Sequence, residues 1–281
     1  MDNKFTHIIG QILFCLIVII IAIYILFPIY WALNSSLKTG SQLVMTPVTF
    51  VPRDPKTLEL KPTFENYLVV FRSKQYLTGL LNSVIVAGST SVLSLMIGSF
   101  GAFALGKLRF RGKTPSLYVI LSMTMFPQIA VLTGLYTIAR LFRISAIPSM
   151  ILSYLLFTLP FSVWVLTAFF KGLPSEIMQA AQVDGATPFQ TFHMILLPLS
   201  APALVTTGLL AFINAWNEFL FALTFTAIEP SARTVTVAVA FFGSTFTSQS
   251  MAAAIVTTIP AIILILIFHN RITSGITGVD M

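Results

Sequence analysis

Charged residues are scarce in this chain of 281 residues, because only 9% are Asp, Glu, Lys or Arg, whereas 56% are hydrophobic. The mean hydropathy is +0.91. A soluble domain cannot bury so much apolar surface, and long uncharged runs are typical of polytopic membrane proteins. Spans and their loops take up the whole length. We therefore expect a single transmembrane domain, residues 1–281, embedded in a lipid bilayer.

Cysteine and histidine are also rare. The one cysteine, Cys15, lies in an apolar run, which excludes a disulfide or a cysteine cluster. The histidines His7, His193 and His269 are far apart in sequence, so we expect no metal site. The net charge of +7 is ordinary for loops that face anionic lipid headgroups. Nucleic acid is therefore not an expected partner.

Long apolar stretches predict an all-α fold with about six transmembrane helices. They cover residues 8–33, 82–105, 116–141, 147–170, 203–226 and 250–268. The first follows a basic start, but it is longer than the apolar core of a secretory signal, which is about 7–15 residues. We therefore expect the first stretch to remain in the protein as an uncleaved span. Pro127 and Pro160 are expected to break the third and fourth spans, either as simple kinks or because those spans line a pathway.

Two loops are long. Residues 34–81 contain several prolines, which argue against a long helix there, and Thr63 is expected to cap a short helix over 63–71. This loop is either a connector or a surface for a partner. Residues 228–249, rich in Thr, Ser and Phe, form a second loop. In a plan of six spans it lies on the side of the membrane opposite to residues 171–200.

Small residues recur at every fourth position of the second span. They are Ser94, Gly98, Ala102 and Gly106. Such a stripe lets another helix approach closely, so we expect it to be a site of tight helix packing.

Residues 106–114, GKLRFRGKT, are similar to a phosphate-binding loop. Their glycine spacing is one residue too long, and no strand precedes them. A phosphate cradle needs a strand–loop–helix scaffold to aim its backbone amides. We therefore expect no ATPase activity in this chain.

Three polar residues share one face of the fifth span, namely Asn214, Asn217 and Glu218. Glu218 is the one acid well inside a span, and such groups usually face a bundle interior or a cavity. This face predicts either the lining of a pathway for a hydroxylated solute or an interhelical contact.

Residues 174–198, between the fourth and fifth spans, predict two short helices with a sharp break. Ser175 is expected to be the N-cap of the first helix, with Glu176 in its first turn, where the helix dipole favours an acid. Gly185 is expected to end that helix in the left-handed conformation. Thr187 then restarts the chain, with Pro188 at the first helical position.

In this second helix Gln190 completes a capping box with Thr187. Phe189, Phe192 and Leu196 are predicted to share one face. Residues 171–200, which we name the coupling segment, are either an ordinary loop or a compact knob. Small residues beside a forced turn suit a knob that docks into a groove of a partner.

This segment resembles the EAA motif of the inner-membrane permease subunits of ABC importers, EAA-x-x-DGA followed by I-x-LP. The matching residues are Ala180, Ala181, Asp184, Gly185, Ala186, Ile195, Leu197 and Pro198. Gln179 stands where the family has its first acid, which removes any salt bridge from that position. The strings at 216–219 and 82–87 are similar to the carbohydrate, maltose-type subfamily, in which this chain resembles the second permease.

The resemblance implies a permease subunit that forms half of the pathway of an ATP-driven, binding-protein-dependent importer of a carbohydrate or related polyol. Implied partners are a second permease subunit, two ATP-binding subunits and an extracytoplasmic solute-binding protein. The ATPases would bind ATP and Mg²⁺, and this chain would bind no cofactor. The implied contacts with an ATPase are Glu176, Gln179, Ala180, Ala181, Asp184, Gly185, Ala186, Phe189 and Phe192.

Six spans place both termini and the coupling segment on one side of a bacterial-type inner membrane. The dense basic loop at 107–113 predicts that this side is cytoplasmic. An ion-coupled secondary transporter that acts without an ATPase is the alternative function. It would need intramembrane acids, for which Glu218 is the only candidate.

Overall fold

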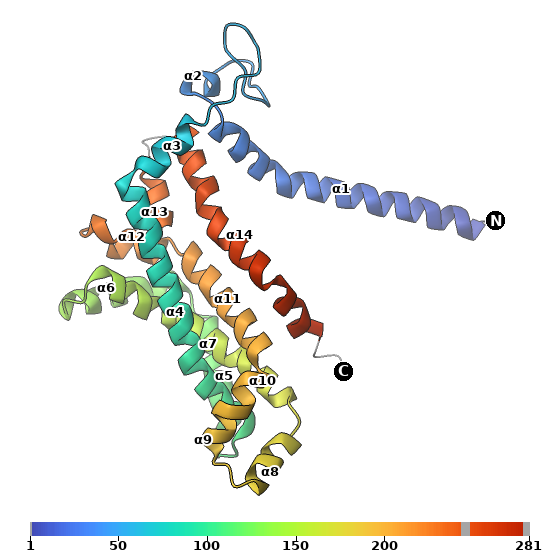
Figure 1. Cartoon of the computed structure of the whole chain (residues 1–281), viewed down its shortest axis with the longest axis vertical. Coiled ribbons are helices and arrows are strands. Elements are labelled where there is room, and N and C mark those ends of the chain that lie inside the picture. The colour runs from blue at the N-terminus through green and yellow to red at the C-terminus, as the bar shows by residue number, and fades with distance from the viewer. Residues whose placement is uncertain (1, 243–247, 278–281) are drawn as a thin grey trace. The chain divides into compact units, whose positions relative to one another are not determined.

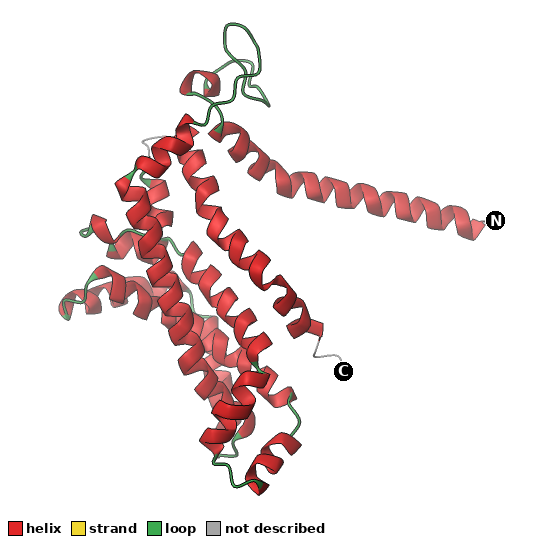
Figure 2. Cartoon of the chain, viewed as in Figure 1, coloured by secondary structure: helices red, strands yellow, loops and turns green. Residues whose placement is uncertain are grey.

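A computed structural model describes residues 2–242 and 248–277 of the chain. Helices joined by loops make up these residues, and no strand is found among them (Figure 2). The all-α prediction is confirmed.

Contacts divide the chain into two compact units. The first comprises residues 1–76 and 239–258, and the second residues 77–238 and 259–281. Two helices, α4 (Lys74–Lys107) and α14 (Ser248–Thr277), each contribute to both units.

The first unit contains α1 (Asp2–Ser36), α2 (Gly40–Leu43) and α3 (Glu65–Arg72). Its loop is ordered by its own hydrogen bonds. Lys38 is buried, and its Nζ donates to the Thr49 carbonyl at 2.5 Å and lies 5.5 Å from the Trp31 ring centroid. The Asn66 amide donates to the carbonyls of Ser36 and Lys38. Residues 37–64 are thus a folded cap rather than a loose connector.

Four single helices are long and apolar enough to cross a membrane, and the described residues allow up to six spans if each of two bent pairs is one span. The single helices are Gly10–Ser36, Lys74–Lys107, Ala146–Gly172 and Ser248–Phe268. The first pair, α5 (Lys113–Thr124) and α6 (Gln128–Leu141), bends by 91°. Pro127 precedes α6 directly, so the expected break in the third span is found.

The fourth span is α7 (Ala146–Gly172), and it differs from the prediction because Pro160 lies inside a continuous helix. Pro160 is buried, and α7 packs against α5 and α11 (Ala201–Asn217) of the same unit. Neighbours on several sides let a helix accommodate a proline, because they hold it in place and re-satisfy freed backbone groups.

The fifth span is not the continuous helix expected over 203–226. Helix α11 ends at Asn217, Glu218 is extended with φ −68° and ψ 129°, and α12 (Leu220–Phe225) follows. The predicted loop 228–249 contains η2 (Pro230–Ala232) and α13 (Val235–Ala240), while its residues 243–247 lie outside the described part.

The coupling segment contains α8 (Glu176–Val183), α9 (Pro188–Gln190), the π-helix η1 (Thr191–Leu196) and α10 (Leu197–Leu199). The stretch Pro188–Leu199 meets α11 at an angle of 77°. Figure 1 shows α8, α9 and α10 at one end of the second unit and α12 near its other end. The two candidate sites are therefore separated along this unit.

The small-residue stripe of α4 lies against α7. The hydroxyls of Ser94 and Ser162 are 2.8 Å apart. A Cβ atom added at Gly98 would lie 3.2 Å from the Ser162 Cβ, and one added at Gly106 would lie 2.8 Å from the Phe170 Cβ. The approach is tight at Gly98, and at Gly106 an added side chain requires a neighbour to shift.

We expect Gly106→Ala to lower the thermal midpoint of the purified protein, because an overpacked contact typically costs about 1–3 kcal/mol. Gly88→Ala is the matched control in the same helix, since nothing lies within 4 Å of its added Cβ. The control should leave the midpoint unchanged or raise it slightly. Equal midpoints for the two variants would contradict the packing assigned to the stripe.

Candidate functional site

The sharp break in the coupling segment is a Schellman turn at the end of α8. Gly185 has φ +78°. Its N–H donates to the Gln182 carbonyl at 3.1 Å, and the Ala186 N–H donates to the Ala181 carbonyl at 2.9 Å. This pair of bonds satisfies carbonyls that a helix end leaves free. The left-handed glycine predicted here is found, whereas Ser175 makes no side-chain cap at the start of α8, contrary to expectation.

The second helix begins with the predicted capping box. The Thr187 N–H donates to the Gln190 Oε1 at 2.8 Å, and the Gln190 N–H donates to the Thr187 Oγ1 at 3.3 Å. Pro188 occupies the first helical position, where its missing N–H costs nothing. The local sequence alone therefore fixes where this helix starts.

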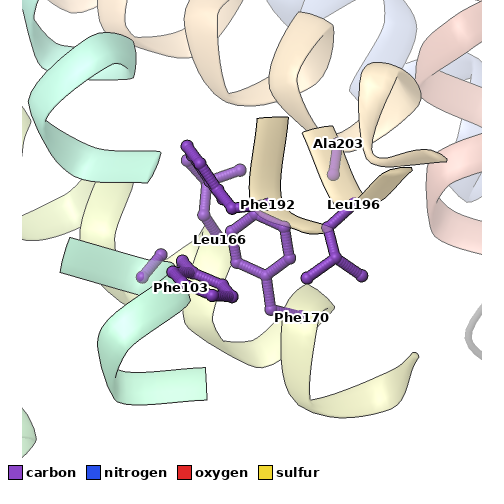
Figure 3. Packing of buried hydrophobic residues seen from close by; sticks show 7 residues of the cluster. Phe103, Leu166, Phe170, Phe192, Leu196 and Ala203 are labelled. Atoms are coloured by element: carbon purple, nitrogen blue, oxygen red, sulfur yellow. The ribbon is translucent and has the colours of Figure 1, made fainter. Parts of the chain in front are cut away.

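Beyond α9, the coupling segment is fastened to the second unit by an apolar cluster (Figure 3). The anchor cluster consists of Ala102, Phe103, Leu166, Phe170, Phe192, Leu196 and Ala203. The Phe192 side chain is 2% exposed and lies among residues of α4 and α7, with its ring centroid 4.9 Å from that of Phe103. Truncating a buried Phe typically costs about 3–5 kcal/mol, so this attachment is firm.

The spacing predicted one shared face for Phe189, Phe192 and Leu196. The rings of Phe189 and Phe192 both lie against Phe100, but only Phe192 and Leu196 are buried in the anchor cluster. Phe189 is 63% exposed and stacks on Phe100 and on His193. The π-helix η1 begins at Thr191, and its wider turn changes the angular offset of Phe192 and Leu196 from Phe189.

The opposite face of the coupling segment is open. Most of the residues with an implied ATPase contact are exposed, namely Glu176, Gln179, Ala180, Asp184 and Gly185, whereas Ala181 is buried and Ala186 is half-buried. Val183 is 88% exposed at the end of α8. Sequence reasoning missed Val183, although an apolar residue four positions after Gln179 falls on the same helix face.

The basic loop after α4 ties the coupling segment to its neighbours. The Lys107 Nζ donates to the Leu173 carbonyl at 2.6 Å, just before α8. The Lys113 Nζ donates to the carbonyls of Gly106 and Leu108 at 3.1 and 3.2 Å. These lysines satisfy carbonyls near helix ends, where the helix dipole favours a cation. They act as structural ties and not as a phosphate cradle.

Near the other end of the second unit lies a cavity of about 470 Å³. Residues of α5, α6, α7, α11 and α12 line it, and Asn214, Asn217 and Glu218 are brought together in its wall. The sequence missed the aromatic residues Phe157, Phe161 and Phe219 of this lining. Phe157 and Phe161 could have been found from their spacing of four residues, which puts both on one helix face.

The carboxylate of Glu218 is occupied within the chain. Its Oε2 accepts a hydrogen bond from the Tyr154 hydroxyl at 2.7 Å and one from the Ala222 N–H at 3.1 Å. Its Oε1 accepts from the Phe221 N–H at 2.9 Å. Glu218 thus satisfies backbone donors at the start of α12 and links α12 to α7, as the interhelical reading of this acid requires.

Three side-chain amides of the cavity are free. The amides of Asn214, Asn217 and Gln128 are exposed and make no hydrogen bond with the part of the chain that the structure describes. Each amide offers two donors and an acceptor. The lining contains no Lys or Arg. Free amides beside aromatic rings can hydrogen-bond an uncharged hydroxylated solute and contact its apolar faces.

Comparisons with known proteins agree with this architecture. The trehalose transport system permease protein SugB of Mycobacterium tuberculosis is 39% identical, over 91% of this chain and 92% of the relative. The trehalose/maltose transport system permease protein MalG of Thermococcus litoralis is 35% identical, over 97% of each chain.

The fold is similar to that of a chain in the crystal structure of a bacterial ABC transporter involved in the import of the acidic polysaccharide alginate. The TM-score is 0.78 at 21% identity, with 94% of this chain and 96% of that chain covered. The model of the family described as binding-protein-dependent transport system inner membrane component matches residues 92–278. This chain therefore belongs to the family of inner-membrane components of binding-protein-dependent transport systems.

Proposed function

We propose that this chain is one permease subunit of an ATP-driven importer of a carbohydrate or related polyol. Family membership and relatives named as trehalose and maltose permeases support this function. One observation carries the coupling role. The coupling segment is fixed on its inner side by the anchor cluster and exposed on its outer side.

The proposed assembly contains a second, different permease, two ATP-binding subunits and an extracytoplasmic solute-binding protein. The partner ATPases bind ATP and Mg²⁺, and this chain contributes no group to hydrolysis. Both termini and the coupling segment face the cytoplasm of a cell with a bacterial-type inner membrane. The basic loop at 107–113 supports this orientation, because positive charge close to span ends is retained on the cytoplasmic side.

In the proposed mechanism the ATPase cleft holds the exposed face of α8, where Gln179, Ala180 and Val183 lie. Closure of the ATPases on ATP moves α8. The anchor cluster passes this movement to α4, α7 and α11, because packed cores shift as units and do not deform gradually. Coupling then requires that the ATP-bound ATPases bind the two permease conformations with different affinity.

The cavity forms this subunit's share of the solute pathway. Asn214, Asn217 and Gln128 hydrogen-bond the solute, and Phe157 and Phe161 contact its apolar faces. Glu218 holds the cavity wall in place and does not contact solute directly. An uncharged solute suits this lining, because an anionic group would find no cation there.

An ion-coupled secondary transporter, the alternative function, would need a free carboxylate within a span to carry the ion. Glu218 lies in the cavity wall, but three donors already occupy its carboxylate. Uptake of labelled trehalose or maltose by the reconstituted assembly distinguishes the two functions. We expect uptake to require ATP and a solute-binding protein and to persist with an uncoupler. Uptake that is abolished by an uncoupler and does not depend on ATP would favour the ion-coupled transporter.

We expect Gly185→Val to abolish uptake while the protein still inserts into the membrane. A β-branched side chain resists the left-handed conformation that the turn requires, so α8 is presented wrongly to the ATPases. The measurement is solute uptake together with the amount of protein in the membrane fraction.

Gly185→Asn is the matched control, because Asn tolerates a left-handed backbone better than other residues. It should retain much of the uptake. Normal uptake in Gly185→Val would argue against a coupling role for this turn.

We expect Glu218→Ala and Asn217→Ala to differ in what they change. Glu218→Ala leaves the Tyr154 hydroxyl and two backbone N–H groups unpaired, which costs about 1–3 kcal/mol for each buried group and lowers the thermal midpoint. Asn217→Ala should keep the midpoint and raise the solute concentration for half-maximal uptake. The opposite pattern would make Glu218 the solute contact.

A further inference from the structure

A pocket of about 390 Å³ lies where the end of α6, the start of α7 and the chain after α12 meet in the second unit. The charged residues of its lining are Arg140, Arg143 and Glu229. Neither arginine belongs to the coupling segment or to the solute cavity. This pocket is thus a charged feature that the proposed function leaves unexplained.

The single acid of the pocket is already engaged. The Oε2 of Glu229 accepts a hydrogen bond at 3.1 Å from the N–H of Ala146, the first residue of α7, where the helix dipole favours a negative charge. Within the described ranges 2–242 and 248–277, neither arginine side chain forms an ion pair or a hydrogen bond. Both side chains are exposed. Two exposed guanidinium groups therefore have no ion-pair partner among the described residues.

The backbone at Arg143 points to a role for its side chain. Arg143 has φ +54° and closes a Schellman turn after α6. Its N–H donates to the Arg140 carbonyl at 3.2 Å, and the Ile144 N–H donates to the Ala139 carbonyl at 2.9 Å. At the equivalent turn after α8 this same chain uses Gly185, which adopts a positive φ without steric cost.

An arginine in this position is strained relative to glycine, and strained backbone is found preferentially at functional sites. Within the described residues the Arg143 side chain forms no hydrogen bond or ion pair, so a group outside the chain is its candidate partner. A guanidinium fork is matched to a carboxylate, which it can bind through two parallel hydrogen bonds.

We infer that Arg140 and Arg143 bind carboxylate side chains on an acidic surface of the extracytoplasmic solute-binding protein. This inference rests on the proposed function, whose orientation puts the connection between α6 and α7 on the outer face of the membrane. The guanidiniums then act as a docking point that steers the loaded binding protein and fixes its register.

A protein partner fits the pocket better than a lipid headgroup does. The hydrogen-bonded turn fixes the backbone of Arg143. A carboxylate that a folded protein also holds in one place suits such a partner. Glu229 shares the pocket and would repel a lipid phosphate that enters without a compensating cation. A folded protein surface can place a donor beside its carboxylate to match Glu229.

The test uses the full assembly in nanodiscs, with the second permease, both ATPases and a solute-binding protein that activates the unmodified complex. Arg143→Gly keeps the turn and removes the guanidinium. We expect the concentration of loaded binding protein for half-maximal ATPase stimulation to rise about tenfold at low salt, as expected for loss of a charge-assisted hydrogen bond. For Arg143→Lys this half-maximal concentration should lie between those of the unmodified complex and Arg143→Gly. Added salt should reduce the difference between the variants.

Arg109→Gly is the matched control, since it removes an exposed basic residue from the loop at 107–113. It should leave the half-maximal concentration unchanged. Arg143→Glu combined with an Asp→Arg or Glu→Arg exchange on the binding protein should restore stimulation.

An unchanged half-maximal concentration in Arg143→Gly, with stimulation intact in the unmodified complex, would overturn the inference and leave the proposed function standing. An altered requirement for anionic lipid with unchanged binding-protein affinity would also overturn it, in favour of a lipid site. Absence of stimulation by any solute-binding protein in the unmodified complex would overturn the proposed function and the inference together.

Discussion

The burial of Phe192 between α4 and α7 is the interaction on which the proposed coupling of this chain to an ATPase depends. Helix α8 packs on the anchor cluster through the partly buried Ile177 and Met178, so this cluster holds the helix in position. Phe192 and Leu196 supply that hold, because they are 2% and 0% exposed inside the anchor cluster. A force applied to α8 therefore reaches the membrane helices through packed side chains. Without the anchor cluster, the same movement would be absorbed by bending of the connecting chain.

The second constraint is that backbone groups inside an apolar medium need partners from the protein itself. The fifth span meets this requirement at its break by using Glu218, whose carboxylate accepts from two N–H groups of α12 and from the Tyr154 hydroxyl. The cavity beside α7 is lined by residues on both sides of this break. The acid thus supplies acceptors for backbone N–H groups where the helix is interrupted.

The sequence predicted those features whose cause is local. The left-handed Gly185 and the capping box of Thr187 and Gln190 follow from the residues themselves, and both are found. Features that depend on neighbours were missed. Pro160 fits inside a helix because α5 and α11 surround α7, and the π-helix that separates Phe189 from Phe192 has no local signal. Likewise, the sequence predicts Glu218 as an acid inside a span. It does not predict that its carboxylate accepts hydrogen bonds from backbone N–H groups of α12.

The Schellman turns after α8 and after α6 have the same hydrogen-bond pattern but are closed by different residues. After α8 the turn must redirect the chain and leave the docking face clear, and Gly185 does this without a side chain. After α6 the same hydrogen-bond pattern is closed by Arg143 at φ +54°, although glycine would be the less strained choice. The hydrogen-bond pattern is the same in both turns, so it does not explain why one has arginine and the other glycine. An arginine at a position that favours glycine is the observation behind the proposed binding of Arg143 to an outside carboxylate, and within the described residues its guanidinium forms no ion pair.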